Sequence, residues 1–151
     1  MKNLPWNVSQ VQKKETQQRP APPFTTSTLQ QAASSRLKLT PRQSMMIAQR
    51  LYEGIDLGGK EREGLITYMR TDSVTLSEKA LKESSEFIGK TYGSDYCGES
   101  RRYKTKSKSA QEAHEAIRPT NFRHTPDSLK GILRGEDLEL YSLIWNRMIA
   151  S

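Results

Sequence analysis

Residues 67–73 bring a tyrosine, an arginine and an aspartate close together in the sequence. A tyrosine hydroxyl ordinarily has a pKa of about 10, so it is a weak nucleophile at neutral pH unless a cation stabilises the phenolate. Arg70 suits that task, because its planar guanidinium stays charged and can hold two oxygens of one phosphate. If this run is a strand, Tyr68 and Arg70 project to the same side, and a phosphate could lie between them. The alternative is a tyrosine that packs its ring and exposes its hydroxyl.

A second candidate for chemistry is His114, which follows a basic stretch of the chain. A histidine titrates close to physiological pH and can donate a hydrogen bond or a proton to a phosphate or a leaving oxygen. Its neighbour Glu115 would point elsewhere on a helix, so the spacing does not make the two a catalytic pair. A histidine that caps or packs locally is the alternative.

The basic stretch lies within residues 93–109, which have few apolar side chains and are expected to form a surface loop. Its basic residues surround Tyr103 and are Arg101, Arg102, Lys104, Lys106 and Lys108. The chain as a whole has 24 Lys+Arg against 17 Asp+Glu, a net charge of +7, which favours polyanionic partners. Tyr103 could stack on an unpaired base, as in proteins that bind single strands, whereas a merely solvated charged surface is the alternative.

Signatures of metal and nucleotide sites are missing from the sequence. It has no pair of Cys or His ligands, no Walker loop and no Asp-x-Asp cluster, so we expect no metal site in this chain. Glu136, Asp137 and Glu139 stand where carboxylates favour a helix N-terminus. The single Cys97 cannot form an internal disulfide. Without a long apolar run or a leader, the chain is expected to be soluble and cytosolic, with no membrane partner.

Most of the chain has helical patterns. Capping boxes at Ser27 and Thr28 predict a helix over residues 27–38, and Thr40 followed by Pro41 predicts a second helix that Gly54 ends. Its apolar stripe is Met45, Ala48, Leu51 and Tyr52. A third helix is predicted over 77–89, with Ala80, Leu81, Ser84 and Ile88 on one face, and a fourth over 136–149, with Leu138, Tyr141, Ile144, Trp145 and Met148.

The other segments are expected to be short. Residues 54–64 predict a loop or hairpin turn, and 65–69 is the best strand. Residues 111–117 predict a short helical segment, and Thr125 with Pro126 caps another. Residues 1–23 are a linker, in which Val8 and Val11 could form an edge strand, and residues 24–151 form the domain. The fold class is mainly α with one or two short β-strands, an order compatible with a winged helix-turn-helix.

Three separated stretches then resemble one family, the type IA DNA topoisomerases. They run from Pro22 to Ala33, from Gly64 to Ser73 and from Gln111 to Thr120, in the family's order and approximate spacing. The likeness spans about Phe24 to Ser151. Methionine at position 69 is similar to the bacterial topoisomerase I branch, since topoisomerase III tends to have proline there.

The resemblance implies roles for individual residues. Tyr68 would attack a single-strand phosphodiester to form a 5′-phosphotyrosyl link, Arg70 would position the phosphate and stabilise its charge, and His114 would assist the reaction near the DNA. Because the ester keeps the bond energy, religation would need no ATP. Further DNA contacts are expected from Thr67, Thr71, Asp72, Arg118 and the basic stretch.

The resemblance also implies parts that this sequence lacks. The family holds Mg²⁺ and a catalytic glutamate in a toprim domain, so we expect the cofactor to belong to a full-length enzyme. The chain would then be an excised, monomeric domain that binds DNA weakly and cannot relax it. Its expected partners are single-stranded DNA, negatively supercoiled duplex DNA, and the enzyme's own toprim and ring domains. The segment from Phe24 to Gln31 and the loop before Tyr68 are expected to contact the toprim domain and to form an exposed face in the isolated chain. The resemblance to this family also implies that the full-length enzyme associates with the nucleoid. A helix-turn-helix-like DNA-binding module without chemistry is the alternative.

Overall fold

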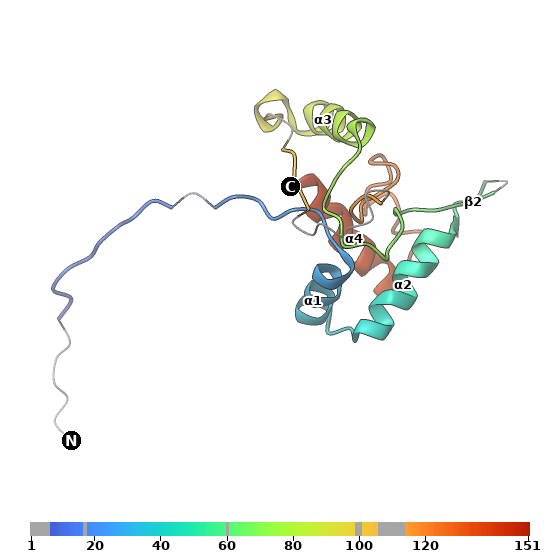
Figure 1. The fold of residues 1–151 in the computed structure, drawn as a ribbon, viewed down its shortest axis with the longest axis horizontal. Helices are drawn as coiled ribbons and strands as arrows, with labels where there is room; N and C mark the ends of the chain where they lie inside the picture. The colour runs from blue at the N-terminus through green and yellow to red at the C-terminus, as the bar shows by residue number, and fades with distance from the viewer. Residues whose placement is uncertain (1–6, 17, 60, 99–100, 106–113) are drawn as a thin grey trace, which may run out of the picture.

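The computed structural model describes residues 7–16, 18–59, 61–98, 101–105 and 114–151 (Figure 1). Its elements in chain order are α1 (Thr26–Leu37), α2 (Pro41–Glu53), β1 (Ile55–Asp56), β2 (Arg62–Glu63), α3 (Glu78–Tyr92), the 3-10 helix η1 (Ser94–Tyr96) and α4 (Gly135–Ile149). β1 and β2 pair antiparallel, with Ile55 opposite Glu63. The described residues therefore confirm a mainly helical fold with short strands.

The four longer predicted helices are present, and short polar side chains cap the N-termini of α1, α2 and α3. Thr40 caps α2 through the Gln43 amide, and Gly54 with a φ of 120° follows its last residue, as the sequence predicts. The helix α1 begins one residue earlier than expected, because Thr25 and Thr28 form its capping box. The prediction that Ser27 and Thr28 were the caps was therefore wrong, although the helix itself is confirmed.

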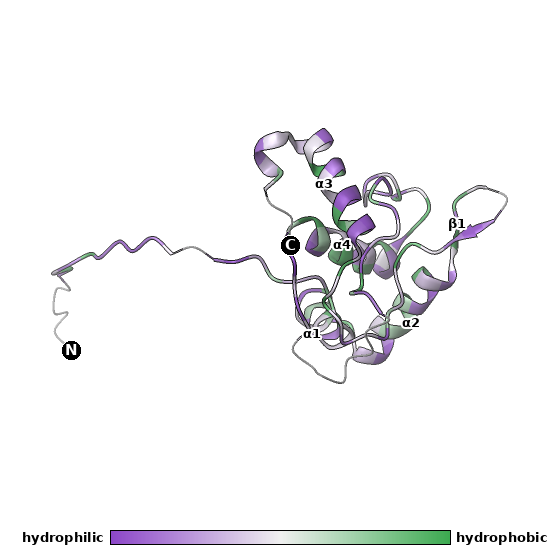
Figure 2. Cartoon of the chain, turned by 45° about the horizontal axis from the view of Figure 1, so that its top comes forward, coloured by the Kyte–Doolittle hydropathy of each residue, from purple (hydrophilic) through white to green (hydrophobic). Residues whose placement is uncertain are grey.

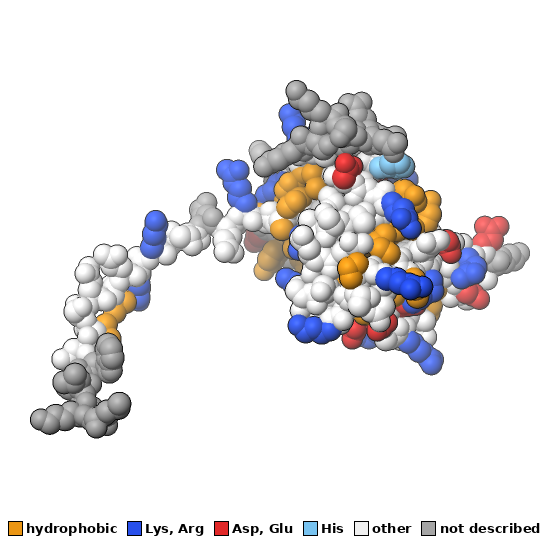
Figure 3. Space-filling view, turned by 60° about the horizontal axis from the view of Figure 1, so that its bottom comes forward, with side chains coloured by type: hydrophobic (Ala, Val, Ile, Leu, Met, Phe, Trp, Pro, Cys, Tyr) orange, Lys and Arg blue, Asp and Glu red, His pale blue; other side chains and the backbone are white. Residues whose placement is uncertain are grey.

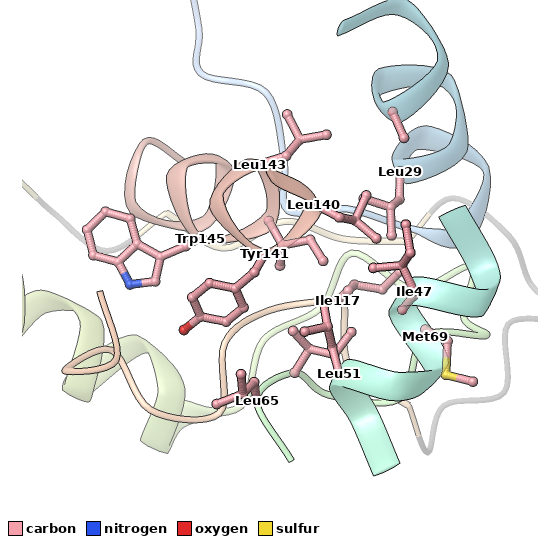
Figure 4. Close-up of a cluster of buried hydrophobic side chains, with 14 of the residues drawn as sticks. Leu29, Ile47, Leu51, Leu65, Met69, Ile117, Leu140, Tyr141, Leu143 and Trp145 are labelled. Carbon is pink, nitrogen blue, oxygen red and sulfur yellow. The ribbon is translucent and has the colours of Figure 1, made fainter. Parts of the chain in front are cut away.

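The core lies where α1, α2 and α4 pack together (Figure 4). α4 is confirmed as its centre, since Tyr141 and Ile144 are fully buried. Leu29 from α1 and Leu51 from α2 meet them, and the connecting segments fill the remaining space with Leu65, Met69 and Ile117. Figure 2 shows this distribution as hydrophobic colour on α4 and hydrophilic colour on the hairpin. Each fully buried aliphatic side chain stabilises the fold by about 1.5–3 kcal/mol relative to exposure.

The strand predicted over residues 65–69 is not formed. Leu65 and Ile66 are both buried, which breaks the alternation of a half-buried strand, and Ile66 makes an isolated bridge to Pro119. The ladder stops there because the Leu65 amide donates to the Leu51 carbonyl at 2.8 Å and the Arg118 amide donates to the Thr67 hydroxyl at 3.0 Å. The chain then bends at Met69 and Arg70. The hairpin instead occupies residues 55–63, within the segment predicted as a loop or hairpin turn.

Two further local predictions were wrong. Of the helical segment expected over 111–117, residues 111–113 lie outside the described ranges, and 114–117 are extended, with the Ile117 amide donating to the Phe24 carbonyl at 2.8 Å. Thr125 does accept a hydrogen bond from the Ser128 amide at 3.2 Å, but the chain makes turns there and no helix. The bridge between Ile117 and the buried Phe24 holds residues 114–117 extended.

The N-terminal expectations had different outcomes. Residues 7–16 and 18–22 run away from the helical body in an extended path (Figure 1), and Val8 and Val11 are exposed and in no strand. Phe24 is fully buried beneath the Arg147 guanidinium, 4.3 Å from its ring centroid, so it cannot belong to an exposed face. Within the described ranges, no helix combines the length and apolar character needed to cross a membrane.

Candidate active site

Tyr68 lies in a cluster of three aromatic rings. Its ring centroid is 5.4 Å from that of Tyr52, edge to face, and 5.3 Å from that of His114, with 36° between the planes. Tyr68 keeps 37% of its surface exposed. The structure thus brings together Tyr68 and His114, two candidates that the sequence could not place near each other.

The segment before Tyr68 is anchored by Thr67. The Thr67 hydroxyl donates to the Ala116 carbonyl at 2.7 Å and accepts from the Arg118 amide at 3.0 Å, while the Thr67 amide donates to the Arg118 carbonyl at 2.9 Å. These bonds tie Tyr68 to the segment that follows His114. The expected DNA contact from Thr67 stays a prediction, and its hydroxyl is already used inside the protein.

Glu115 anchors the segment that carries His114. One carboxylate oxygen accepts from the Ser77 amide, 2.5 Å away at the start of α3, and the other accepts from the Arg118 guanidinium at 2.6 and 3.0 Å. Burial alone would raise the pKa of the Glu115 carboxyl, but the bonds from Ser77 and the charge of Arg118 outweigh it and hold that pKa below its ordinary value. Glu115 therefore serves as a clamp with Arg118 and not as a partner of His114.

Arg70 and His114 border the same open depression, of about 630 Å³. Its other lining residues are Thr26, Ser27, Gln30, Thr71 and Asp72. Arg70 and Asp72 are exposed, whereas Thr71 is buried and its hydroxyl accepts from the Ser73 amide at 3.0 Å. A guanidinium and an imidazole on one depression can hold a phosphate group. Tyr68 lies beside it through its contact with His114.

The described part of the basic stretch lies on the surface. Arg101 and Lys104 are exposed, Arg102 forms an ion pair with Glu78, and Lys106 and Lys108 lie outside the described residues. The Tyr103 hydroxyl donates to the Pro20 carbonyl at 3.4 Å. On the face drawn in Figure 3, basic side chains are scattered among uncharged and hydrophobic ones. DNA binding by this stretch stays a prediction.

Arg118 is largely buried, although we expected it to contact DNA. Its side chain is only 12% exposed, and the guanidinium is bound to Glu115 and to the Pro119 carbonyl at 2.9 Å. An arginine held in this way is poorly available to a DNA phosphate. The structure thus gives Arg118 an internal contact, and the DNA contact expected of it stays a prediction.

The sequence reasoning missed two residues of the site. Tyr52 was assigned to the apolar stripe of α2, yet it is 41% exposed and its ring contacts Tyr68. Thr26 was assigned no role, yet it lines the depression with Arg70. Helical spacing around Leu51 would place Tyr52 near the core, so no local signal marked it as a site residue.

A larger hollow, of about 800 Å³, lies between α3 and residues 120–123. It includes neither Tyr68 nor Arg70 nor His114, and its lining mixes Lys79 and Lys90 with acidic side chains such as Glu83 and Glu86. Carboxylates repel phosphate, and the larger hollow has Glu63, Glu83 and Glu86 against Asp72 alone at the smaller depression, which is therefore the better candidate. Among the described residues, no three His, Cys, Asp or Glu side chains are grouped as metal ligands.

Comparison with known proteins identifies the family. The family described as DNA topoisomerase matches residues 1–151. DNA topoisomerase 1 of Rickettsia felis is 52% identical over 99% of this chain and 19% of its own length, and that of Campylobacter jejuni is 48% identical over 99% and 21%. Full-length topoisomerase I from Thermotoga maritima superposes with a TM-score of 0.73 at 42% identity, over 86% of this chain and 20% of its own. The chain spans about a fifth of these relatives, and it belongs to the DNA topoisomerase family.

Proposed function

We propose that this chain is the strand-cleaving part of a type IA DNA topoisomerase that relaxes negatively supercoiled DNA. The observation that carries the proposal is the meeting of three groups at one place. Tyr68 contacts His114 at 5.3 Å between ring centroids, and His114 borders the same depression as Arg70. A nucleophile, a group able to donate a proton and a phosphate-binding cation are what transfer of DNA to a tyrosine requires.

The proposed reaction is a reversible transesterification. The Tyr68 oxygen attacks the phosphorus of one strand, an O–P bond to the tyrosine forms, and the bond from phosphorus to the 3′ oxygen breaks. The phenol proton leaves to solvent or a nearby base, and the 3′ oxygen takes up a proton to become a hydroxyl. Arg70 holds the non-bridging oxygens, whose charge grows in the transition state. The reverse reaction reseals the strand without ATP, because the phosphotyrosyl ester keeps the bond energy.

Type IA enzymes, which this chain resembles, use Mg²⁺, and the described residues offer no fitting group of ligands. We propose that a toprim domain elsewhere in a longer protein holds the metal, consistent with the small share of each relative that this chain covers. The chain alone would then bind single-stranded DNA weakly, act as a monomer and fail to relax DNA. In the cell, the longer protein would work on the nucleoid in the cytoplasm.

The proposed DNA-binding architecture is a winged helix-turn-helix. Two features support it: α1 and α2 pack against each other with the short connection Lys38 to Thr40, and the β1–β2 hairpin follows directly. In this arrangement the hairpin would be the wing. The exposed Arg101 and Lys104 would contribute charge that attracts the DNA backbone.

The test uses end-labelled single-stranded DNA and the longer protein, with covalent adducts trapped by denaturant. Wild type should give an adduct at Tyr68, and Tyr68→Phe should give none, because the ring remains but the nucleophile is gone. Tyr96→Phe is the matched control, since Tyr96 is 73% exposed on η1. Undiminished adduct from Tyr68→Phe would exclude Tyr68 as the nucleophile, and the absence of an adduct from wild type would leave a DNA-binding module without chemistry. Relaxation by the isolated chain would overturn the requirement for a separate toprim domain.

A further inference from the structure

The hydroxyl of Thr26 bridges the two peptide groups that flank Arg70. It donates to the Met69 carbonyl at 2.7 Å, just before Arg70, and accepts from the Thr71 amide at 2.9 Å, just after it. The Thr26 amide also donates to the Thr71 carbonyl at 2.9 Å. Thr26 therefore holds the backbone on both sides of Arg70 to the first turn of α1.

This contact is not part of the helix cap. Thr25 is the N-cap of α1, and its hydroxyl accepts from the Thr28 amide at 3.3 Å while the Thr28 hydroxyl accepts from the Thr25 amide at 2.9 Å. The Thr26 hydroxyl lies outside this capping box. Loss of that hydroxyl would thus leave the cap of α1 in place and remove a contact to the Arg70 segment.

The Arg70 segment needs such a support because it is irregular. It bends at Met69 and Arg70, and the described chain has no strand there whose ladder would fix the direction of the Arg70 side chain. Arg70 is exposed, with no side-chain hydrogen bond among the described residues, whereas its neighbour Met69 is buried at 4% exposure. The bonds of Thr26 and the burial of Met69 therefore decide where the guanidinium can reach.

We propose that Thr26 is a positioning residue for Arg70, holding the guanidinium on the depression that it shares with His114. The inference rests on the proposed function, in which Arg70 binds the phosphate at which the strand is cut. Thr26 acts through the backbone, so its effect belongs to the chemical step more than to DNA affinity. A misplacement of even about 1 Å at a reacting group can cost on the order of 100-fold in rate.

The test compares Thr26→Val, which keeps the shape but removes the hydroxyl, with Thr26→Ser, which keeps the hydroxyl. In the longer protein, Thr26→Val should lower kcat for cleavage of single-stranded DNA about tenfold and change KM less than about twofold. Thr26→Ser should stay within about twofold of wild type. Thr91→Val is the matched control, because Thr91 is exposed on α3 and makes no side-chain hydrogen bond among the described residues. Thr26→Ala replaces Thr26→Val if the valine variant unfolds.

A double-mutant cycle separates positioning from a general structural effect. If Thr26 acts through Arg70, Thr26→Val should cause no further loss of kcat in an Arg70→Ala background. An equal loss in both backgrounds, or a Thr26→Val rate equal to that of Thr91→Val, would overturn the inference. If Arg70→Ala alone keeps the wild-type rate, the proposed role of Arg70 fails, and that result is distinct from a failure of Thr26.

Discussion

Tyr68 and His114 lie 46 positions apart in the sequence, and their rings are 5.3 Å apart between centroids, with 36° between their planes. Tyr52 contacts the other side of the cluster at 5.4 Å. The position of the Tyr68 hydroxyl is thus set by rings that come from α2 and from the segment after the basic stretch. Contacts of this kind contribute about 0.5–1.5 kcal/mol each beyond the area that they bury.

Replacement of His114 by phenylalanine should separate its packing from its chemistry. The new ring can still contact Tyr68, but it cannot donate a proton or a hydrogen bond, so we expect cleavage by the longer protein to slow by roughly 100-fold. Single-turnover cleavage of labelled single-stranded DNA would measure this. His124→Phe is the control, because His124 pairs with Glu63 and does not line the depression. A His114→Phe rate close to wild type would show that the ring contact is all that His114 supplies.

The contact between Tyr52 and Tyr68 should appear as a coupling energy. Tyr52→Leu, Tyr68→Leu and the double variant form a cycle in which we expect a coupling of about 0.5–1 kcal/mol in the free energy of unfolding. Urea unfolding of the chain measures each value. Tyr92→Leu, on α3, should show no coupling to Tyr68, since its ring contacts Phe87 and Tyr96 instead. If the two single substitutions add up to the loss of stability in the double variant, the contact between Tyr52 and Tyr68 is not stabilising.

Gly64 should not tolerate a side chain, whereas Gly59, five positions earlier, should tolerate one. A Cβ at Gly64 would lie 2.6 Å from the Tyr52 carbonyl oxygen, so the end of α2 or the start of the Tyr68 segment must move. We expect Gly64→Ala to cost about 1–3 kcal/mol in the free energy of unfolding and to slow cleavage. Gly59→Ala places its Cβ where nothing lies within 4 Å, so it should change stability by less than about 0.5 kcal/mol. Equal stability of the two variants would mean that the close approach is not maintained in solution.

The Glu115 clamp should make stability depend on pH. Because the pKa of the Glu115 carboxyl is held below its ordinary value in the folded chain, its contribution is present at neutral pH and is lost as the pH falls through the folded pKa. Glu115→Gln should therefore be destabilised by about 1–2 kcal/mol at pH 7, and the difference from wild type should shrink below about pH 4. Denaturant unfolding between pH 7 and 3 gives the comparison. A difference that stays constant over this range would exclude a role for the carboxylate charge.

Local sequence signals determined the helices and the candidate residues. Thr40, Pro41 and Gly54 fix the ends of α2 through their own hydrogen bonds and φ preferences, so a short window of sequence was enough. The same holds for α4, whose apolar spacing placed Tyr141 and Ile144 in the core. Tyr68, Arg70 and His114 were identified by residue type and by resemblance to the family.

The tertiary structure decided what those residues meet. Leu65 to Met69 has a strand-like composition, but the Leu65 amide bonds to Leu51, so its pairing with Pro119 stops after one bridge, and the core takes up two adjacent side chains. Tyr52 joins Tyr68 through contacts across 16 positions of the chain, and Thr26 reaches the backbone beside Arg70 across more than 40. Arg118 meets Glu115 and not an open surface. Such contacts depend on how separated segments pack, and spacing within one segment carries no information about them.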